Sequence, residues 1–422
     1  MGIGSSVRRW TLSARILLVV LIATGLNLAL DAVIVAFGGR AGTLTDLAYR
    51  YQDFFHFALS FPPDGPVAAA SIESGRVASA IEQDLYTRSA PGSITNLHVP
   101  PFTATLAIAA SAAMRSVDPS LLFFGLLLAL VGWWIALVRR FAPTGERGAL
   151  IALGIVAYPM LQMANRGNLF AGLTALLLIT AMLLSAHRRA PVLAGTMVAL
   201  AMCIRPNSLV FVVPLLLLQP RWRSAAGALI VVWGVVTIGT YAIAHTVYPR
   251  YSVASMLDAL QLYHAKYVVE NAGLGYGSSF LGGLKLAFYR YHPALEVIGA
   301  LTGLAIIGTA IVLHIVRPLT PVLLLFLTLA GYALGSAVFA DYHLMAFLII
   351  PLIVARGPMG RSTLVAVIAT TAMLLPKSIY LRNFVTTQAG LNPLILLLAV
   401  LAVLALEAHA RLRQGQPVVQ TG

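Results

Sequence analysis

Long apolar runs, separated by short polar connections, recur along the whole chain and limit what it can fold into. Twelve runs approach or reach the roughly 17–25 residues with which a helix crosses a bilayer. They cover residues 16–37, 121–138, 148–163, 169–185, 191–204, 207–218, 225–244, 295–316, 319–339, 344–355, 363–375 and 391–406. In lipid only helices and closed barrels satisfy the backbone, and these runs lack the alternation of barrel strands. The sequence predicts an all-α polytopic membrane protein with about twelve transmembrane helices, in one domain over residues 1–422.

The composition excludes several other classes of protein. Hydrophobic residues make up 59% of the chain and charged residues 10%, whereas soluble proteins carry about a quarter charged residues. The net charge of +14 comes from arginines between apolar runs, so no nucleic-acid partner is expected. The single cysteine, Cys203, allows no internal disulfide and no Cys-based metal site. We expect no cofactor, while several acids in one loop leave a metal requirement open.

Basic residues flank every second connection and predict the orientation of the chain. These residues are Arg8, Arg9, Arg15, Arg139, Arg140, Arg147, His187, Arg188, Arg189, Arg221, Arg223, Arg317, Arg356, Arg361, Arg411 and Arg413. Both termini are therefore expected in the cytoplasm, with long outer loops at residues 38–101 and 247–293. The short run 102–114 fits only as an interfacial or re-entrant helix, because a further crossing would place Arg139 outside. The first run contains Asp31 and lacks a small-residue cleavage site, which indicates an uncleaved anchor.

The outer connections collect polar residues of two kinds. Acids gather in the first outer loop, while Arg, Lys and His lie in the others. A carboxylate beside a cationic pocket suits group transfer from a phosphate-linked donor, since the carboxylate accepts a hydroxyl proton and the cations stabilise the departing phosphate. Walker A, G-x-G-x-x-G, H-E-x-x-H and G-x-S-x-G patterns are absent. A donor already embedded in the membrane is thus favoured. The alternative is that these charges are solvated loop residues or snorkelling anchors.

Short segments in a fixed order resemble the motifs of one family. They are Gln52-Asp53-Phe54-Phe55-His56-Phe57-Ala58, Asp84-Leu85-Tyr86, His98-Val99-Pro100-Pro101-Phe102, Arg166-Gly167-Asn168, Arg205-Pro206, Arg221-Trp222-Arg223, and Asn271 to Ser279. This order resembles polytopic GT-C glycosyltransferases related to the actinobacterial polyprenyl-phosphate-mannose-dependent α-mannosyltransferases. Three features depart from the family pattern. Val99 stands where the family has an aromatic residue, Arg205 stands where it has Lys, and the stretch between Asp53 and Asp84 is longer than typical.

The resemblance implies an activity and a catalytic acid. The reaction is an inverting transfer of a sugar, mannose above others, from a polyprenyl-phosphate donor to a lipid-linked or glycan acceptor. It would take place on the outer side of the cytoplasmic membrane, among membrane lipids. Asp53 would be the general base, and Asp46, which a D-L-x-Y reading also fits, is the rival. A helix N-cap is the structural alternative for either residue.

The remaining candidate residues are cations and polar groups on the outer side. Arg166, Arg205, His343 and Lys266 are expected to bind the donor phosphate, because guanidinium groups match a phosphodiester in geometry. The expected substrate-binding residues are His56, Asn168, His264 and Tyr276. Snorkelling, helix capping and solvated loops are the alternative roles for these side chains.

Two other functions remain open at this stage. A polyprenyl-phosphate-arabinose arabinofuranosyltransferase would use the same kind of donor. A twelve-span secondary transporter belongs to a different class. Transporters often show matching halves with paired broken helices, which are not evident in this sequence.

Overall fold

The computed structural model describes residues 11–37, 99–114, 116–249, 251–269, 278–288, 290–357, 359–377, 380–382 and 385–414. Asp46, Asp53, His56 and Tyr276 lie outside these ranges. Interfacial helices expected within residues 38–98 lie outside them too.

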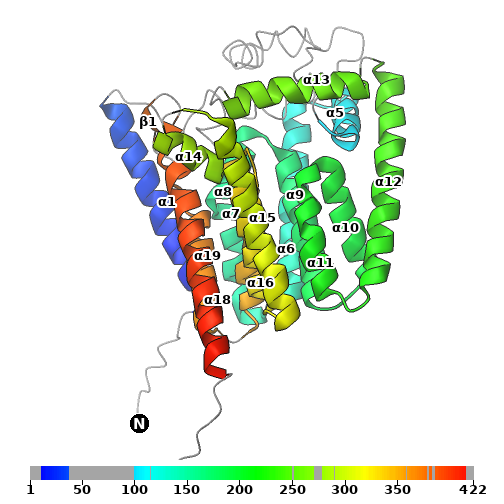
Figure 1. Ribbon diagram of the computed structural model, residues 1–422. Coiled ribbons are helices and arrows are strands. Elements are labelled where there is room, and N and C mark those ends of the chain that lie inside the picture. Colours follow the sequence, from blue (N-terminus) through cyan, green and yellow to red (C-terminus); the bar gives the residue numbers. More distant parts are fainter. Residues whose placement is uncertain are drawn as a thin grey trace, which may run out of the picture.

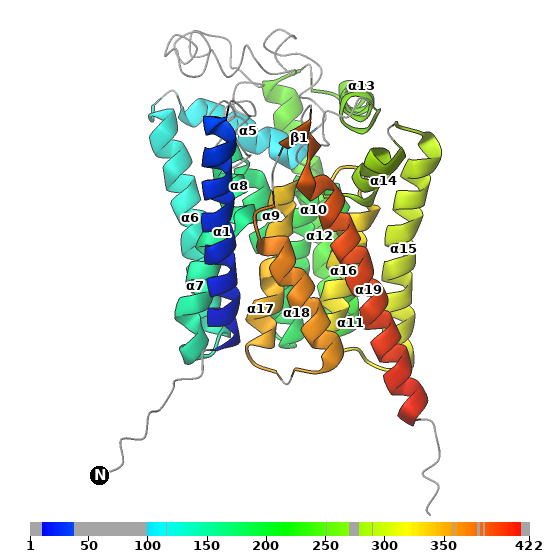
Figure 2. The ribbon, with the colours of Figure 1, turned by 90° about the vertical axis from the view of Figure 1, so that its left-hand side faces the viewer.

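Long apolar helices run side by side and form a bundle (Figures 1 and 2). Among the described residues, six helices are long and apolar enough to cross a membrane. They are α1 (Leu12–Ala36), α6 (Pro119–Phe141), α9 (Leu169–Ala186), α12 (Trp222–Val247), α15 (Pro293–Val316) and α19 (Thr387–Gln414). A seventh span is formed if α7 (Arg147–Val156) and α8 (Tyr158–Arg166) count as one, with a 41° bend between them. Pro159 at the start of α8 accounts for the break, since proline cannot continue a helix.

Shorter apolar helices complete the bundle. They are α10 (Pro191–Ile204), the 3₁₀-helix η4 (Pro206–Phe211) with α11 (Val212–Leu218), α16 (Pro321–Gly335), the 3₁₀-helix η7 (Asp341–Leu348) with α17 (Ile349–Val354), and α18 (Arg361–Leu374). Each of the twelve predicted segments overlaps a helix, so the all-α multi-pass class is confirmed. Helix length identifies only six or seven as full spans, and the number twelve stays a prediction.

One end of the bundle is covered by helices that lie across it, and we call it the capped end. It carries α5 (Pro101–Ala113), α13 (Val253–Tyr263) and α14 (Phe280–Phe288). Figure 1 shows α13 lying across this end, and Figure 2 shows α5 doing the same. The placement of α5 agrees with the prediction that residues 102–114 do not cross. Helix α1 begins and α19 ends at the opposite end of the bundle.

Two short strands also lie at the capped end, and the sequence analysis did not predict them. Strand β1 (Tyr380–Arg382) pairs antiparallel with β2 (Val385–Thr386), between α18 and α19. The pair is too short to change the helical class of the molecule.

The centre and the periphery of the bundle differ in burial. Helices α9 and α16 are buried along most of their length, whereas α12 exposes large apolar side chains such as Ile238, at 73%. An exposed apolar surface of this size suits contact with lipid or with another apolar surface. At the crossing of α15 and α16, a Cβ on Gly303 would lie 2.4 Å from the Cα of Gly335. The close approach of these two helices therefore requires glycine.

Candidate functional site

The junction of α8 and α9 at the capped end places two predicted residues. Arg166 lies in the last turn of α8, and Gly167 follows it with φ 76°, a left-handed conformation that glycine adopts without strain. Asn168 then caps α9 by accepting a hydrogen bond from the backbone N–H of Ala171 at 3.1 Å. The turn brings the Asn168 side chain inside the bundle, where it is 3% exposed.

Arg205 joins α10 to η4 and contacts this turn. Its Nη2 donates to Oδ1 of Asn168 at 3.3 Å. Its guanidinium carbon lies 5.8 Å from the centre of the Tyr342 ring, within the range of a cation–π interaction. The Nε of Arg205 is buried and has no hydrogen-bond partner among the described residues. An unused buried donor costs free energy unless a ligand or water satisfies it.

His343, on η7, lies on the other side of Tyr342. The two rings meet edge to face with centres 4.8 Å apart, and the His343 ring also contacts Phe339 at 5.2 Å. Both ring nitrogens of His343 are buried and without a hydrogen-bond partner in the described part of the chain. We refer to Asn168, Arg205, Tyr342 and His343 as the Arg205 site.

The chemistry of the Arg205 site suits an anion. A guanidinium and an imidazole both contact the Tyr342 ring, and the Asn168 amide contacts the guanidinium. Three nitrogen atoms of Arg205 and His343 have no partner among the described residues. Charge-assisted hydrogen bonds from such groups to phosphate oxygens are strong, and a guanidinium can make two at once. Three of the predicted site residues, Asn168, Arg205 and His343, are thus brought together. Tyr342 was missed, although its place between Asp341 and His343 was a usable signal.

A buried carboxylate lies directly beside this site, at the start of η7. Asp341 is fully buried and accepts hydrogen bonds from the Tyr158 hydroxyl at 2.9 Å and the Ser278 hydroxyl at 2.8 Å. The Asn392 amide in turn donates to Ser278 Oγ at 2.8 Å. We call Tyr158, Ser278, Asp341 and Asn392 the Asp341 cage. The sequence analysis assigned no role to any of them.

Lys377, after α18, lies near the cage. Its ammonium donates to the carbonyls of Ala372 and Leu375. Burial lowers the pKa of Lys377 to about 7, and the nearby Asp341 carboxylate opposes part of that shift. Asp341 therefore has a nearby amine, about half protonated at neutral pH, as well as neutral hydrogen-bond donors.

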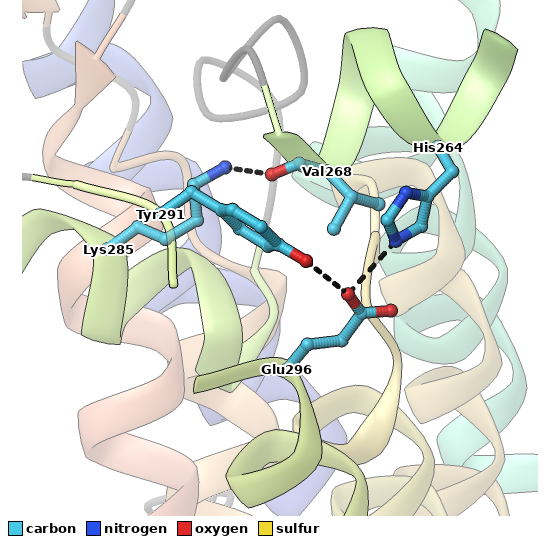
Figure 3. Close-up of polar contacts among 5 residues, drawn as sticks. All are labelled: His264, Val268, Lys285, Tyr291 and Glu296. Atoms are coloured by element: carbon cyan, nitrogen blue, oxygen red, sulfur yellow. Dashed lines mark hydrogen bonds and ion pairs between the residues drawn. The ribbon is translucent and has the colours of Figure 1, made fainter. Parts of the chain in front are cut away.

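A second polar cluster lies at the capped end, where the π-helix η5 (His264–Val269) meets α14 and α15 (Figure 3). Oε2 of Glu296 lies 2.9 Å from Nε2 of His264, and it accepts a hydrogen bond from the Tyr291 hydroxyl at 2.9 Å. Lys285 is 4% exposed, donates to the carbonyl of Val268, and lies 5.7 Å from the centre of the Tyr291 ring. Burial lowers the Lys285 pKa to about 8, against the opposing effect of Glu296.

Two residues predicted from the sequence, His264 and Lys266, lie in the π-helix of this second cluster. His264, expected to bind substrate, contacts Glu296 and Tyr291 in the described structure. The backbone of Lys266 lies in the π-helix, and its side chain is outside what the structure describes. Single π-turns occur often at functional sites, so the segment stays of interest. The sequence analysis missed Glu296, because a single acidic residue at the start of a helix resembles a helix-capping residue.

The other expectations are tested in part. No group of three or more His, Cys, Asp or Glu side chains that could hold a metal ion occurs among the described residues. The acids of the first outer loop, Asp46 and Asp53 included, lie outside those residues. Comparisons of the chain with protein-family models, curated proteins and solved structures give no match.

Proposed function

We propose that the protein is a membrane-embedded inverting glycosyltransferase. It transfers a sugar, mannose first of all, from a polyprenyl-phosphate donor to a lipid-linked or glycan acceptor on the outer side of the cytoplasmic membrane. The supporting observation is the Arg205 site, where Arg205 Nε and both ring nitrogens of His343 are buried without partners among the described residues. An anionic head group would accept hydrogen bonds from Arg205 Nε and from the one ring nitrogen of His343 that carries a proton, and a bundle exposed to lipid would accommodate the polyprenyl tail.

The reaction assigns a task to each group. The acceptor hydroxyl attacks the anomeric carbon from the face opposite the phosphate, so a new C–O bond forms while the bond to the phosphate oxygen breaks. The phosphate leaves with the electron pair, and Arg205 and His343 stabilise its charge. The hydroxyl proton passes to a carboxylate, which is Asp53 by the resemblance, with Asp46 as the alternative. A GT-C-like arrangement of twelve spans is part of this proposal.

A second candidate, the secondary transporter, is supported by a different observation. Asp341 is fully buried near Lys377, inside a bundle of apolar helices. Ionisable residues inside membrane proteins often mark ion or proton pathways. Arabinose transfer differs from mannose transfer only in the sugar, so the phosphate-binding chemistry is the same for both.

Sugar transfer by purified protein separates these functions. Detergent-solubilised protein is incubated with labelled polyprenyl-phosphate mannose or arabinose and a membrane lipid extract as acceptor. We expect transfer by the wild type and a large loss in Arg205→Ala. Arg140→Ala is the matched control, because Arg140 also lies over an aromatic ring, that of Phe141, in the last turn of α6, a helix that runs from the capped end to the opposite end of the bundle. A folded protein that transfers neither sugar would favour the transporter.

A further inference from the structure

The Asp341 cage joins parts of the chain that are far apart in sequence. Tyr158 comes from α8, Ser278 precedes α14, Asp341 opens η7 and Asn392 belongs to α19. All four residues are 0% exposed. A buried carboxylate is tolerated where donors surround it, and removing one donor leaves a poorly satisfied charge. The cage therefore fixes the start of η7 relative to three other segments.

Helix η7 depends on such outside contacts. It is a 3₁₀-helix of eight residues, and no side chain caps its N-terminus. Helices of this type rarely exceed three or four residues, because their hydrogen-bond geometry is poor. With three residues per turn, Asp341, Tyr342 and His343 project in three different directions. Asp341 reaches the cage, while Tyr342 meets Arg205 and packs against the His343 ring.

The chain just before η7 is held by the same segment that supplies Ser278. The backbone N–H of Ser278 donates to the carbonyl of Phe339 at 2.6 Å, and the Ser279 hydroxyl donates to the carbonyl of Ala337 at 3.3 Å. Phe339 packs its ring against His343. The segment that leads into α14 thus contacts both the Asp341 carboxylate and Phe339, the residue whose ring packs against the His343 imidazole.

We infer that Asp341 is a positioning residue, which through its cage holds Tyr342 and His343 against Arg205 and so ties donor binding to the segment before α14 and to α19. The inference rests on the proposed function, since it takes the donor phosphate as the occupant of the Arg205 site. Asp341 touches no reacting group in this role. It acts through the geometry of η7.

Ser278→Ala tests the inference without removing the carboxylate. The matched control is Ser185→Ala, because Ser185 is also 0% exposed, donates to a carbonyl at 2.8 Å and accepts from the Gln219 amide at 3.5 Å. Two quantities are measured for each folded variant: hydrogen exchange of the amides of residues 341–348 without ligand, and the affinity for farnesyl phosphate in detergent. We expect Ser278→Ala to speed exchange in η7 and to weaken binding about tenfold, the effect of one strong hydrogen bond. Ser185→Ala should change neither.

A double variant separates positioning from general loss of stability. If Ser278 acts through η7, its replacement should weaken binding less in a His343→Gln background than in the wild type. Equal effects in both backgrounds would overturn the inference, as would η7 exchange no faster than in Ser185→Ala. If neither Arg205→Ala nor Ser278→Ala weakens binding of farnesyl phosphate, the proposed phosphate site is refuted. The exchange measurement still reports on η7 in that case.

Discussion

Single side chains at the capped end carry the proposed phosphate site. Arg205 offers a guanidinium whose Nη2 is already bound to Asn168 and whose Nε is not satisfied by any described residue. A lysine at this position would supply a point charge without the planar fork, so the two residues are not equivalent. Under the proposed function, Arg205 in place of Lys would allow a second hydrogen bond to the same phosphate.

Arg205→Ala should weaken binding of farnesyl phosphate by about 1.5–3 kcal/mol, the value of a hydrogen bond to a charged group. Arg205→Lys should recover only part of that loss, because it restores the charge but not the fork. Isothermal titration in detergent measures both variants beside Arg140→Ala. If Arg205→Ala binds farnesyl phosphate with the affinity of the wild type, Arg205 does not bind the phosphate and is a snorkelling residue.

Asp53→Asn keeps the shape of the side chain and removes its basicity. As general base it should contribute about 10²–10⁴-fold, so we expect transfer to fall by that factor while donor binding survives. Asp46→Asn should have a much smaller effect on turnover. If Asp46→Asn abolishes transfer and Asp53→Asn does not, the base is Asp46. Normal turnover in both variants would exclude this loop as the source of the base.

The lowered pKa of Lys285 predicts that the stability of the folded protein depends on pH. Its pKa of about 8 in the folded protein lies below the ordinary value of 10.5, so the unfolded chain binds more protons between these values. Stability therefore rises with pH from about 8 to about 10.5, and the cost of burying the ammonium is fully present below about 8. Lys285→Met should raise Tm at pH 7 and lose that advantage near pH 10. A Tm difference from the wild type that is the same at both pH values would contradict this.

At the scale of elements, sequence patterning predicts the helices well and their contacts poorly. Hydropathy marked all twelve segments that overlap helices, and α5 lies across the end of the bundle, in agreement with the argument from Arg139 that residues 102–114 do not cross. The 3₁₀ form of η7 and the π-helix leave no pattern in hydropathy, because both arise from tertiary packing. Asn168, Arg205 and His343 were found because each is polar at the end of a span. Tyr158, Ser278 and Asn392 were not, since only the fold brings them to Asp341.

The crossing of α15 and α16 gives a prediction for packing. Gly303→Ala would place a methyl group 2.4 Å from the Cα of Gly335 and 2.6 Å from the carbonyl oxygen of Gly331. The helices must separate, and we expect a loss of about 1–3 kcal/mol in the free energy of unfolding. Gly308→Ala, on the same helix with open space around it, should be neutral or stabilising. Unfolding in mixed detergent compares the two, and equal stabilities would argue against the close crossing.

At the scale of the whole molecule, the bundle has two unlike ends. Helix α1 begins and α19 ends at one of them, while α5, α13 and α14 cover the other. The arginine pattern predicts that the first end faces the cytoplasm. The Arg205 site, near the capped end, would then be reached from outside the cell membrane.

Cysteine labelling in a Cys203→Ser background tests this orientation. An impermeant thiol reagent added to intact cells should modify a cysteine introduced at Ser93 and leave one at Arg140 unmodified until the membrane is opened. If only the cysteine introduced at Arg140 is modified, the predicted orientation is wrong and must be reversed. The side of the membrane from which acceptors bind would then be reversed as well.

The Asp341 cage also has a consequence for biogenesis. Asn392 belongs to α19, which follows all the other described helices in the chain. During synthesis, Tyr158, Ser278 and Asp341 enter the membrane before their last partner has left the ribosome. Asp341 has both of its hydroxyl donors before then, but Ser278 gains its contact with Asn392 only when the final helix inserts. The arrival of α19 therefore completes the cage, so a ribosome paused before that helix would hold a protein in which one of the four cage residues is still missing.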